Sequence, residues 1–445
     1  MEGNTDLKKD LGLIIATALV TGNMMGSGIF MLPATLASKS GPGATLLAWI
    51  ITALGSIFLA LSFAKLGSKY PLTGGPTEFS RIAFGDYMGF LNAWLYWNGS
   101  WIGNAAVIIA VASYAGKLIP AIADNHLIGF IFTSVILWIF TAINIFGVRK
   151  AGKIQTTITI FELLLFLFFI IVALFHINFS NFIPVFPSGK GIETIPSAAT
   201  STLWAFVGLE SASIAAGEIR NPGRNVKLST ILGICIAACM YLLINFAAIG
   251  SMPQKVLAES KAPIADILSQ YFGTGMTTFI TFAVIISVLG TTVGWLLSTA
   301  RVAFAAGENG VFPKCFAKVH PKFKTPYVSL IIGSVLVNVL LFMNYNKTLL
   351  EAFNFIILLA TLSFLPVYAF TAAAEIQLLI KKDKNFTVFK FIKSALIPLL
   401  GFAYACWAIY GSGADAAMWG FILMLSGMPF YVYMNLKNKK SVDPE

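Results

Sequence analysis

The chain has 445 residues, of which 57% are hydrophobic and 11% are charged. A water-soluble protein of this length carries about 25% charged residues, so this composition excludes a soluble globular protein. The net charge of +11 could indicate a nucleic-acid partner, but the positions of the basic residues along the chain account for it in another way. Apolar runs of about 20 residues recur along the chain and predict an all-α polytopic membrane protein.

We predict twelve transmembrane helices, numbered here as spans 1 to 12. Each run is long enough to cross a bilayer core of about 30 Å. The first run is long, is interrupted by glycine and has no cleavage site, so it is not expected to be a cleavable signal. In chain order, the predicted spans are 11–37, 43–66, 87–115, 126–146, 154–176, 194–216, 227–250, 275–305, 327–345, 348–373, 391–411 and 416–436.

Lysine and arginine are distributed unevenly between the two sides that these spans define. The N-terminus, every second loop and the C-terminus hold 24 of the 30 basic residues. Because cytoplasmic loops are enriched in lysine and arginine, this split predicts that both termini are cytoplasmic. The excess positive charge is therefore a topology signal, and no nucleic-acid partner is expected. The other side holds only Lys39, Lys117, Lys190, Lys255, Lys261 and Lys347.

Span 1 contains the sequence TGNMMGSGIFMLP, with Gly22, Gly26 and Gly28 near its midpoint. Glycine destabilises a helix interior by about 1 kcal/mol relative to alanine. Irregular backbone inside a bilayer is tolerated where it lines a protein cavity, so a break here predicts a binding site. Free amides near Ser27 and Gly28 would suit a carboxylate, and free carbonyls near Gly22 and Asn23 would suit an ammonium group. Alternatively, the glycines allow close helix packing.

Span 6 has a polar cluster at its midpoint, in which Gly208 is followed by Glu210, Ser211 and Ser213. Secondary transporters often contain inverted repeats with broken helices at corresponding positions. If spans 1–5 and 6–10 are such repeats, span 6 is expected to be broken as span 1 is. An ionisable residue within the membrane usually marks a substrate or proton pathway, which makes Glu210 a candidate for exchanging a proton against a cationic substrate. Alternatively, its carboxyl group caps free amides of the broken helix.

Span 5 contains a second ionisable residue, Glu162, with no basic neighbour in its own span. An unpaired carboxylate among leucine and phenylalanine would be protonated or would face a polar cavity. The alternative is a neutral carboxyl group hydrogen-bonded between helices.

Two tryptophans stand out by position. Trp204 lies four residues before Gly208, and Trp295 lies in the glycine-containing stretch LGTTVGWLL of span 8. A desolvated tryptophan face attracts a cation by about 2 kcal/mol or more. The alternative for each ring is packing or lipid contact.

One face of span 3 is polar at membrane depth. Tyr96, Ser100, Asn104 and Val107 recur at helical spacing in the sequence LYWNGSWIGNAAV. This face predicts a cavity wall, and the alternative is hydrogen bonding between helices.

The sequence gives no sign of an enzyme or an ATP-driven pump. It contains no G-x-x-x-x-G-K-[ST] motif, and its histidines lie in or near loops. Cys235 and Cys239 lie four apart on span 7, but no histidine or further cysteine completes a metal-ligand set, so we expect them to pack between helices. No cofactor and no metal are expected.

Four sequences together resemble a known family: GNMMGSGIFMLPATLAS, LYWNGSWIGN, WAFVGLESASIAAGEIRNPGRNV and ENGVFPK. They resemble the amino acid–polyamine–organocation transporters, and most closely the bacterial basic amino acid/polyamine antiporters. The resemblance implies a LeuT-like fold in the bacterial inner membrane. It places a first repeat at 1–176, a second at 194–373, two extra helices at 391–436 and a cytoplasmic tail at 437–445.

The resemblance also implies roles for individual residues. Tyr96 and Trp295 match gating aromatics, and Glu210 matches a carboxylate linked to pH dependence. Glu162 replaces a small residue or a lysine and could bind a proton, a second cation or the substrate amine. The residues expected to contact substrate are Asn23, Ser27, Gly28, Gly99, Ser100, Asn104, Trp204, Val207 and Trp295.

The expected function is exchange of a cationic amino acid for its decarboxylated amine by alternating access. The pairs that the resemblance suggests are arginine/agmatine, ornithine/putrescine and lysine/cadaverine. The alternative is a proton-coupled amino acid symporter of the same fold. The expected partners are a small-molecule substrate, the lipid bilayer and a second copy of the chain in a homodimer.

Overall fold

The structure is a computed structural model that describes residues 11–72, 74–146, 151–323, 325–343, 345–382 and 388–442. The described residues are mainly helical, and their one β pairing is an isolated bridge between Leu11 and Ile219. The all-α prediction is confirmed. The α-helices are α1 Leu13–Met24, α2 Ser27–Lys39, α3 Pro42–Lys69, α4 Pro76–Phe84, α5 Asp86–Leu118, α6 Pro120–Asp124, α7 His126–Phe146, α8 Ala151–Phe175, α9 Ile195–Leu203, α10 Ser211–Ile214, α11 Pro222–Ser251, α12 Gln254–Glu259, α13 Pro263–Glu308, α14 Tyr327–Met343, α15 Leu349–Lys382, α16 Val388–Gly411 and α17 Ala414–Val442.

Within the described ranges, ten helical segments are long and apolar enough to cross a membrane. One of them, Leu13–Lys39, includes α1 and α2 and the break between them. Predicted span 9 corresponds to the shorter apolar helix α14, and predicted span 6 consists of short helical pieces. The protein is therefore a multi-pass helical membrane protein, and the arrangement of twelve spans stays a prediction.

Two helices extend well beyond their predicted bounds. α13 has 46 residues and begins before the predicted 275–305, with a kink at Gly273, where φ is +71°. α15 has 34 residues and continues past the predicted end at 373. The predictions followed the apolar runs, whereas a helix also continues through polar residues, because its backbone hydrogen bonds are internal.

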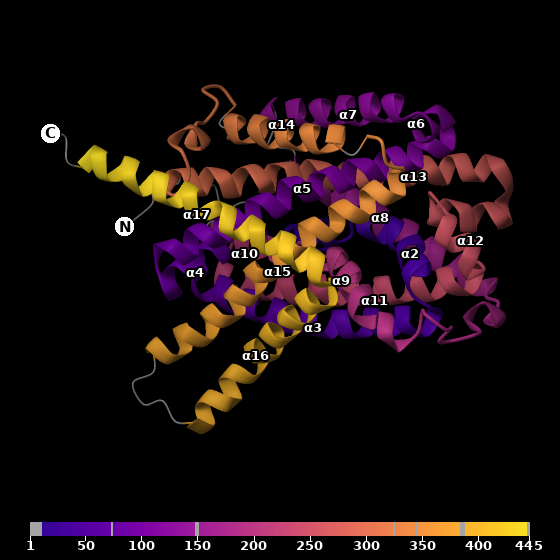
Figure 1. Ribbon diagram of the computed structural model, residues 1–445, viewed down its shortest axis with the longest axis horizontal. Helices are drawn as coiled ribbons and strands as arrows, with labels where there is room; N and C mark the ends of the chain where they lie inside the picture. The colour runs from indigo at the N-terminus through magenta and orange to yellow at the C-terminus, as the bar shows by residue number, and fades with distance from the viewer. Residues whose placement is uncertain are drawn as a thin grey trace.

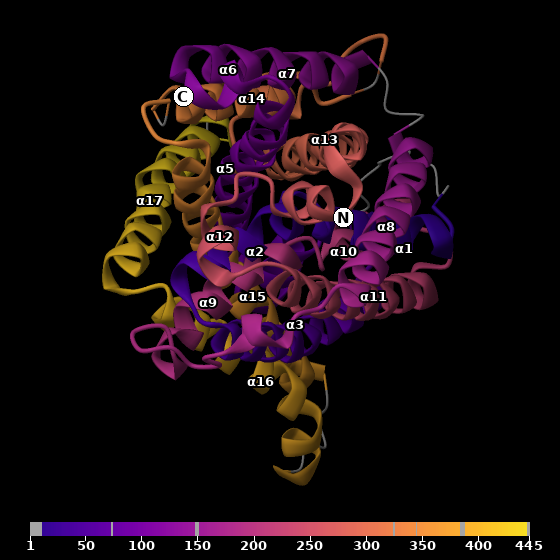
Figure 2. The ribbon, with the colours of Figure 1, turned by 90° about the vertical axis from the view of Figure 1, so that its right-hand side faces the viewer.

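The helices differ in how deeply they are buried. In the most apolar stretch of each, the share of buried residues falls from 78% in α5 to 17% in α17. α5 crosses the centre of the molecule and packs against α13 and α15 (Figure 1). In both views α7 and α14 lie side by side along one edge, and α16 projects from the opposite edge (Figures 1 and 2). The core is thus built around α5, and α17 lies outside it.

The ion pairs join segments that the topology prediction places on the same side. Lys65 Nζ lies 2.7 Å from Glu375 Oε1, which links the ends of α3 and α15 on the lysine-rich side. Lys117 pairs with Asp266, which links α5 and α13 on the other side. These contacts agree with the predicted alternation of loops, and which side is cytoplasmic stays a prediction.

Candidate functional site

The break predicted in span 1 is present, with α1 ending at Met24 and α2 beginning at Ser27. The glycines around it also pack closely. A Cβ atom on Gly22 would collide with the side chain of Thr159 in α8, and one on Gly26 would lie 2.6 Å from Cγ2 of Thr291 in α13. The break and the close packing are therefore both present, and the binding site stays a prediction.

The N-terminus of α2 opens toward the interior of the protein. In the described part of the chain, no side chain caps this end, where Gly26 is the N-cap residue. The first amides of a helix lack intrahelical acceptors and carry partial positive charge. The side chain of Ser27, which was predicted to contact substrate, lies outside the described residues. The backbone of Ser27 is the first residue of α2.

The break predicted in span 6 is also present and begins earlier than expected. α9 ends at Leu203 and is followed by the 3₁₀ turn η4, Trp204–Phe206. Val207 is extended, and Gly208 has φ +115°. A Cβ atom on Gly208 would lie 3.0 Å from the carbonyl carbon of Asn23, so the two breaks contact each other at this glycine. Only glycine fits both the φ angle and the contact.

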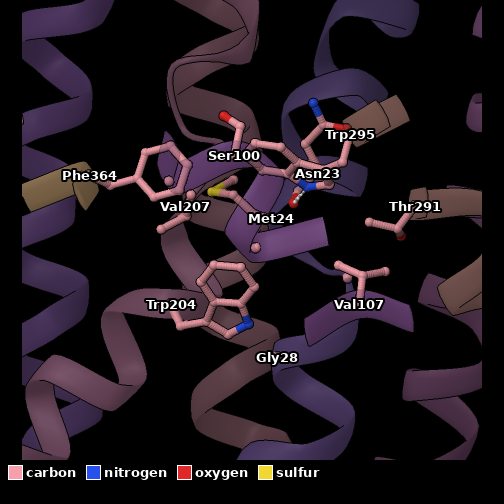
Figure 3. A pocket seen from close by; sticks show the side chains of 13 residues that line it. Asn23, Met24, Gly28, Ser100, Val107, Trp204, Val207, Thr291, Trp295 and Phe364 are labelled. Carbon is pink, nitrogen blue, oxygen red and sulfur yellow. Dashed lines mark hydrogen bonds between the residues drawn. The ribbon is translucent and has the colours of Figure 1, made fainter. Parts of the chain in front are cut away.

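A small cavity lies between these breaks and the helices α5, α13 and α15. Figure 3 shows Phe364 and Val207 on one side of it, Thr291 and Val107 on the other, and Trp204 below and between them. Its lining residues are Asn23, Met24, Gly26, Gly28, Gly99, Ser100, Gly103, Val107, Trp204, Val207, Thr291, Trp295 and Phe364. The structure thus brings together seven of the predicted substrate contacts: Asn23, Gly28, Gly99, Ser100, Trp204, Val207 and Trp295.

The indole ring of Trp204 lies between two glycines. A Cβ atom on Gly28 would be 2.9 Å from Trp204 Cδ1, and one on Gly103 would be 2.6 Å from Trp204 Cη2. Trp204 is 8% exposed. The glycines therefore leave room for the ring and fix it against the cavity.

Asn23 holds four helical segments together. Its Nδ2 atom donates to Ser211 Oγ in α10 over 2.8 Å, and its Oδ1 atom accepts from Gln155 Nε2 in α8 over 2.6 Å. Its carbonyl oxygen accepts a hydrogen bond from Trp295 Nε1 in α13 over 2.9 Å. The prediction that this carbonyl is free is therefore wrong, because the indole of Trp295 occupies it.

Aromatic side chains connect the cavity to the interior of α5 and α15. Trp295 and Phe364 line the cavity with ring centroids 6.2 Å apart. Tyr96 lies behind them, with its ring 5.1 Å from that of Phe364 in an edge-to-face contact. Tyr96 is therefore one layer away from the space that a substrate would fill.

Glu210 is completely buried, and both its carboxyl oxygens have donors. Oε1 accepts from the Tyr96 hydroxyl over 2.8 Å. Oε2 accepts from the Tyr368 hydroxyl over 2.8 Å and from the Gly208 amide over 3.2 Å. This arrangement matches the capping alternative, since the carboxyl group accepts from an amide of the broken helix. Glu210 does not line the cavity.

The polar face of α5 is only partly a cavity wall. Ser100 lines the cavity, and its hydroxyl donates to the Tyr96 carbonyl over 2.7 Å. Asn104 lies outside the lining: its Nδ2 atom donates to Thr299 Oγ1 in α13 over 3.0 Å. Its Oδ1 atom is buried without a partner among the described residues. For Asn104 the alternative of hydrogen bonding between helices is therefore the observed one.

Glu162 is 1% exposed in α8 and also lies outside the cavity lining. Its Oε1 atom is buried and has no hydrogen-bond partner among the described residues. The sequence predicted that Glu162 is either protonated or directed into a polar cavity. Glu162 does not line the cavity described above.

Several residues of the site were not predicted from the sequence. Gly103 carried a signal, because a glycine inside a buried helix usually marks a close approach. Met24 is next to the break, but nothing in its type distinguished it. Thr291, Phe364 and Tyr368 belong to α13 and α15, and the sequence could not fix which of their faces meets the break.

The cysteines of span 7 face outward. Cys235 and Cys239 are both exposed on α11. The expectation that they pack between helices is wrong. Residues four apart share one face of a helix, and the face of α11 that carries these two cysteines points away from the other helices. The described residues contain no group of three histidine, cysteine or acidic side chains placed to hold a metal ion.

Comparison with known proteins places this architecture. The family described as amino acid permease matches residues 11–434, which is nearly the whole chain. The chain belongs to the amino acid permease family. The permease is 33% identical, in an alignment of 464 positions, to a protein of Bacillus subtilis (strain 168) named for arginine/ornithine antiport, covering 97% of this chain and 98% of that one. It is 30% identical, in an alignment of 458 positions, to the arginine/agmatine antiporter of Chlamydia pneumoniae, covering 99% of this chain and 93% of that one.

Proposed function

We propose that this permease exchanges a cationic amino acid for its decarboxylated amine across the bacterial cytoplasmic membrane. The observation that carries the proposal is the buried Trp204 ring, which lies against the cavity between two helix breaks. The end-to-end likeness to proteins named for arginine/ornithine and arginine/agmatine antiport supports the substrate class. Arginine, ornithine and lysine, with their amines, are the candidate pairs.

The cavity offers complementary groups for the two ends of such a substrate. The uncapped N-terminus of α2, at Gly26 and Gly28, suits the α-carboxylate. The Trp204 and Phe364 faces suit the aliphatic chain and the cationic head group. None of the residues that line the cavity is acidic, so the head group is held by ring faces and by neutral oxygens such as Ser100 Oγ. A decarboxylated amine keeps the head group of its amino acid, so both exchange partners can make these contacts, and only the amino acid brings a carboxylate to the N-terminus of α2.

Alternating access would act on the two breaks. The inverted repeats proposed at 1–176 and 194–373 place one break in each repeat. Glu210 ties the second break to α5 and α15 through Tyr96 and Tyr368, and Trp295 ties the first break to α13. We assign gating roles to Glu210, Tyr96 and Trp295, because rocking of one repeat against the other must strain these hydrogen bonds.

A proton-coupled amino acid symporter of the same fold is the second candidate. The observation that favours it is the buried oxygen of Glu162 without a partner among the described residues. In a symporter this carboxyl group would carry the proton that drives uptake.

The test is counterflow in liposomes with purified protein. Uptake of labelled arginine, lysine, ornithine, agmatine and putrescine is followed without a proton gradient, in liposomes that are empty or preloaded with unlabelled substrate. Uptake into preloaded liposomes alone is the expected result, and the best pair identifies the substrates. Uptake into empty liposomes that rises with an imposed proton gradient would contradict exchange and indicate the symporter. Trp138→Ala, in an exposed tryptophan of α7, is the control variant that retains transport.

A further inference from the structure

Glu162 lies on the face of α8 that packs against the break between α1 and α2. One turn before it, the Thr159 hydroxyl donates to the Ala18 carbonyl of α1 over 3.5 Å, and the same side chain contacts Gly22. One turn after it, the Phe166 ring lies 4.8 Å from the Phe30 ring of α2. Because residues three and four apart share a helix face, Glu162 is level with the interrupted backbone between Gly22 and Phe30.

The helices packed against this face of α8 supply almost no charge. They are α1, α11 and α13, with α2 above the break. α1 has no titratable side chain, and α13 has none between Tyr271 and Arg301. α2 carries only Lys39, at its far end. No ion pair within the described ranges includes Glu162.

Tyr241 of α11 is a buried titratable residue close enough to Glu162 for their charges to influence each other. The Tyr241 hydroxyl donates to the Ala205 carbonyl in η4 over 2.7 Å, so its hydrogen is directed to the second break and not to Glu162. Cys235 and Cys239 are exposed on the same helix. Arg224 and Lys227 are exposed at its N-terminal end.

An ionised carboxylate in this environment would be buried without a counter-charge. Transfer of such a group from water into an apolar interior is so unfavourable that the group neutralises instead. A protonated carboxyl group needs no cation, and its remaining acceptor oxygen is tolerated far better than a bare charge. Glu210 differs in this respect, because three donors surround its two oxygens.

We propose that Glu162 binds a proton while α1 and α8 are packed together, and releases it to water when α1 moves away from α8 during transport. The carboxylic acid then becomes a carboxylate, and the proton passes to the solvent that enters between the two helices. Protonation therefore stabilises the packed arrangement around the first break, and one proton is bound and released in each conformational cycle. The role in the cycle rests on the proposed transport function, whereas the protonated state of Glu162 does not.

The direct test is infrared spectroscopy of the purified protein at neutral pH, in H₂O and D₂O. The wild type is compared with Glu162→Gln, and with Glu375→Gln as a matched variant of a buried glutamate that is paired with Lys65. The expected result is a carbonyl stretching band of a protonated carboxylic acid that shifts in D₂O, is lost in Glu162→Gln and is retained in Glu375→Gln. Loss of a carboxylate band instead, with the carboxylic-acid band unchanged, would overturn the proposal.

A second measurement covers the case in which Glu162→Gln folds poorly. In wild-type protein in weak buffer, addition of a transported substrate is followed with a pH-sensitive dye. A stoichiometric proton release or uptake, absent in Glu162→Gln and in Glu162→Met, is expected. Equal proton signals in the wild type and in whichever of these variants folds would overturn the coupling. Because the infrared result needs no transport, failure of the proposed function and failure of this inference give different patterns.

Discussion

Glu210 and Glu162 are both buried carboxyl groups in the helical core, but their surroundings are opposite. Glu210 accepts hydrogen bonds from Tyr96, Tyr368 and the Gly208 amide. Glu162 has an oxygen with no partner among the described residues. Hydrogen bonds donated to a carboxylate favour its charged form, whereas burial without them favours the neutral form. We therefore expect Glu210 to hold helices in place and Glu162 to be the carboxyl group that exchanges a proton.

The cavity lies outside this comparison, because neither carboxyl group lines it. Substrate affinity is therefore expected to depend on the cavity residues, and the pH response on Glu162. Four substitutions test this separation, from the largest expected effect to the smallest.

Trp204→Ala removes the ring that lies between Gly28 and Gly103. We expect it to weaken binding of a cationic substrate by roughly 1–3 kcal/mol, from the lost cation–π contact and the lost packing. Isothermal titration with purified protein measures the affinity. The control is Trp138→Ala, at an exposed position on α7, which should bind like the wild type. Unchanged affinity in Trp204→Ala would remove this ring from the site.

Glu210→Gln replaces an acceptor-only group with an amide that brings two hydrogens among three donors. At least one donor is then left without an acceptor, so we expect the free energy of unfolding to fall by about 1–3 kcal/mol. Denaturation of the purified protein in detergent measures the loss. If stability is unchanged while the pH dependence of transport becomes flat, then Glu210, and not Glu162, is the group that exchanges a proton.

Tyr368→Phe removes one of the donors and keeps the Glu210 charge. The expected destabilisation is about 1 kcal/mol, the usual net contribution of one hydrogen bond, with the shape of the pH profile retained. The same unfolding assay measures it, with Tyr410→Phe on the exposed surface of α16 as the control. A change in the pH midpoint of transport would show that Glu210 takes part in proton exchange.

Trp295→Phe removes the donor to the Asn23 carbonyl and keeps an aromatic wall. We expect a loss of about 0.5–1.5 kcal/mol in stability, measured by the same unfolding assay, and a smaller change in affinity than in Trp204→Ala. A larger loss of affinity than in Trp204→Ala would place the main substrate contact at Trp295.

The two breaks could be predicted from the sequence, because a run of glycine and polar residues at mid-membrane depth is tolerated mainly where the backbone lines a cavity. Most of the wall from α1, α5 and η4 could be predicted as well. Phe364 and Tyr368 could not, because the apolar residues of α15 are not confined to one face of the helix and its register against the breaks is set by packing. Asn104 was placed in the cavity although a partner in α13, Thr299, turns it away. The local sequence pattern is enough to predict the breaks, whereas the contacts between helices across the core become known only from the tertiary structure.

The most direct test of the account is the pH profile of exchange in liposomes with equal pH on both sides, for the wild type, Glu162→Gln and Tyr368→Phe. Glutamine mimics the protonated carboxyl group. Exchange by the wild type and by Tyr368→Phe is therefore expected to fall by about tenfold per pH unit on the alkaline side of the midpoint, while Glu162→Gln remains level. A falling profile in Glu162→Gln that matches the wild type would contradict the account.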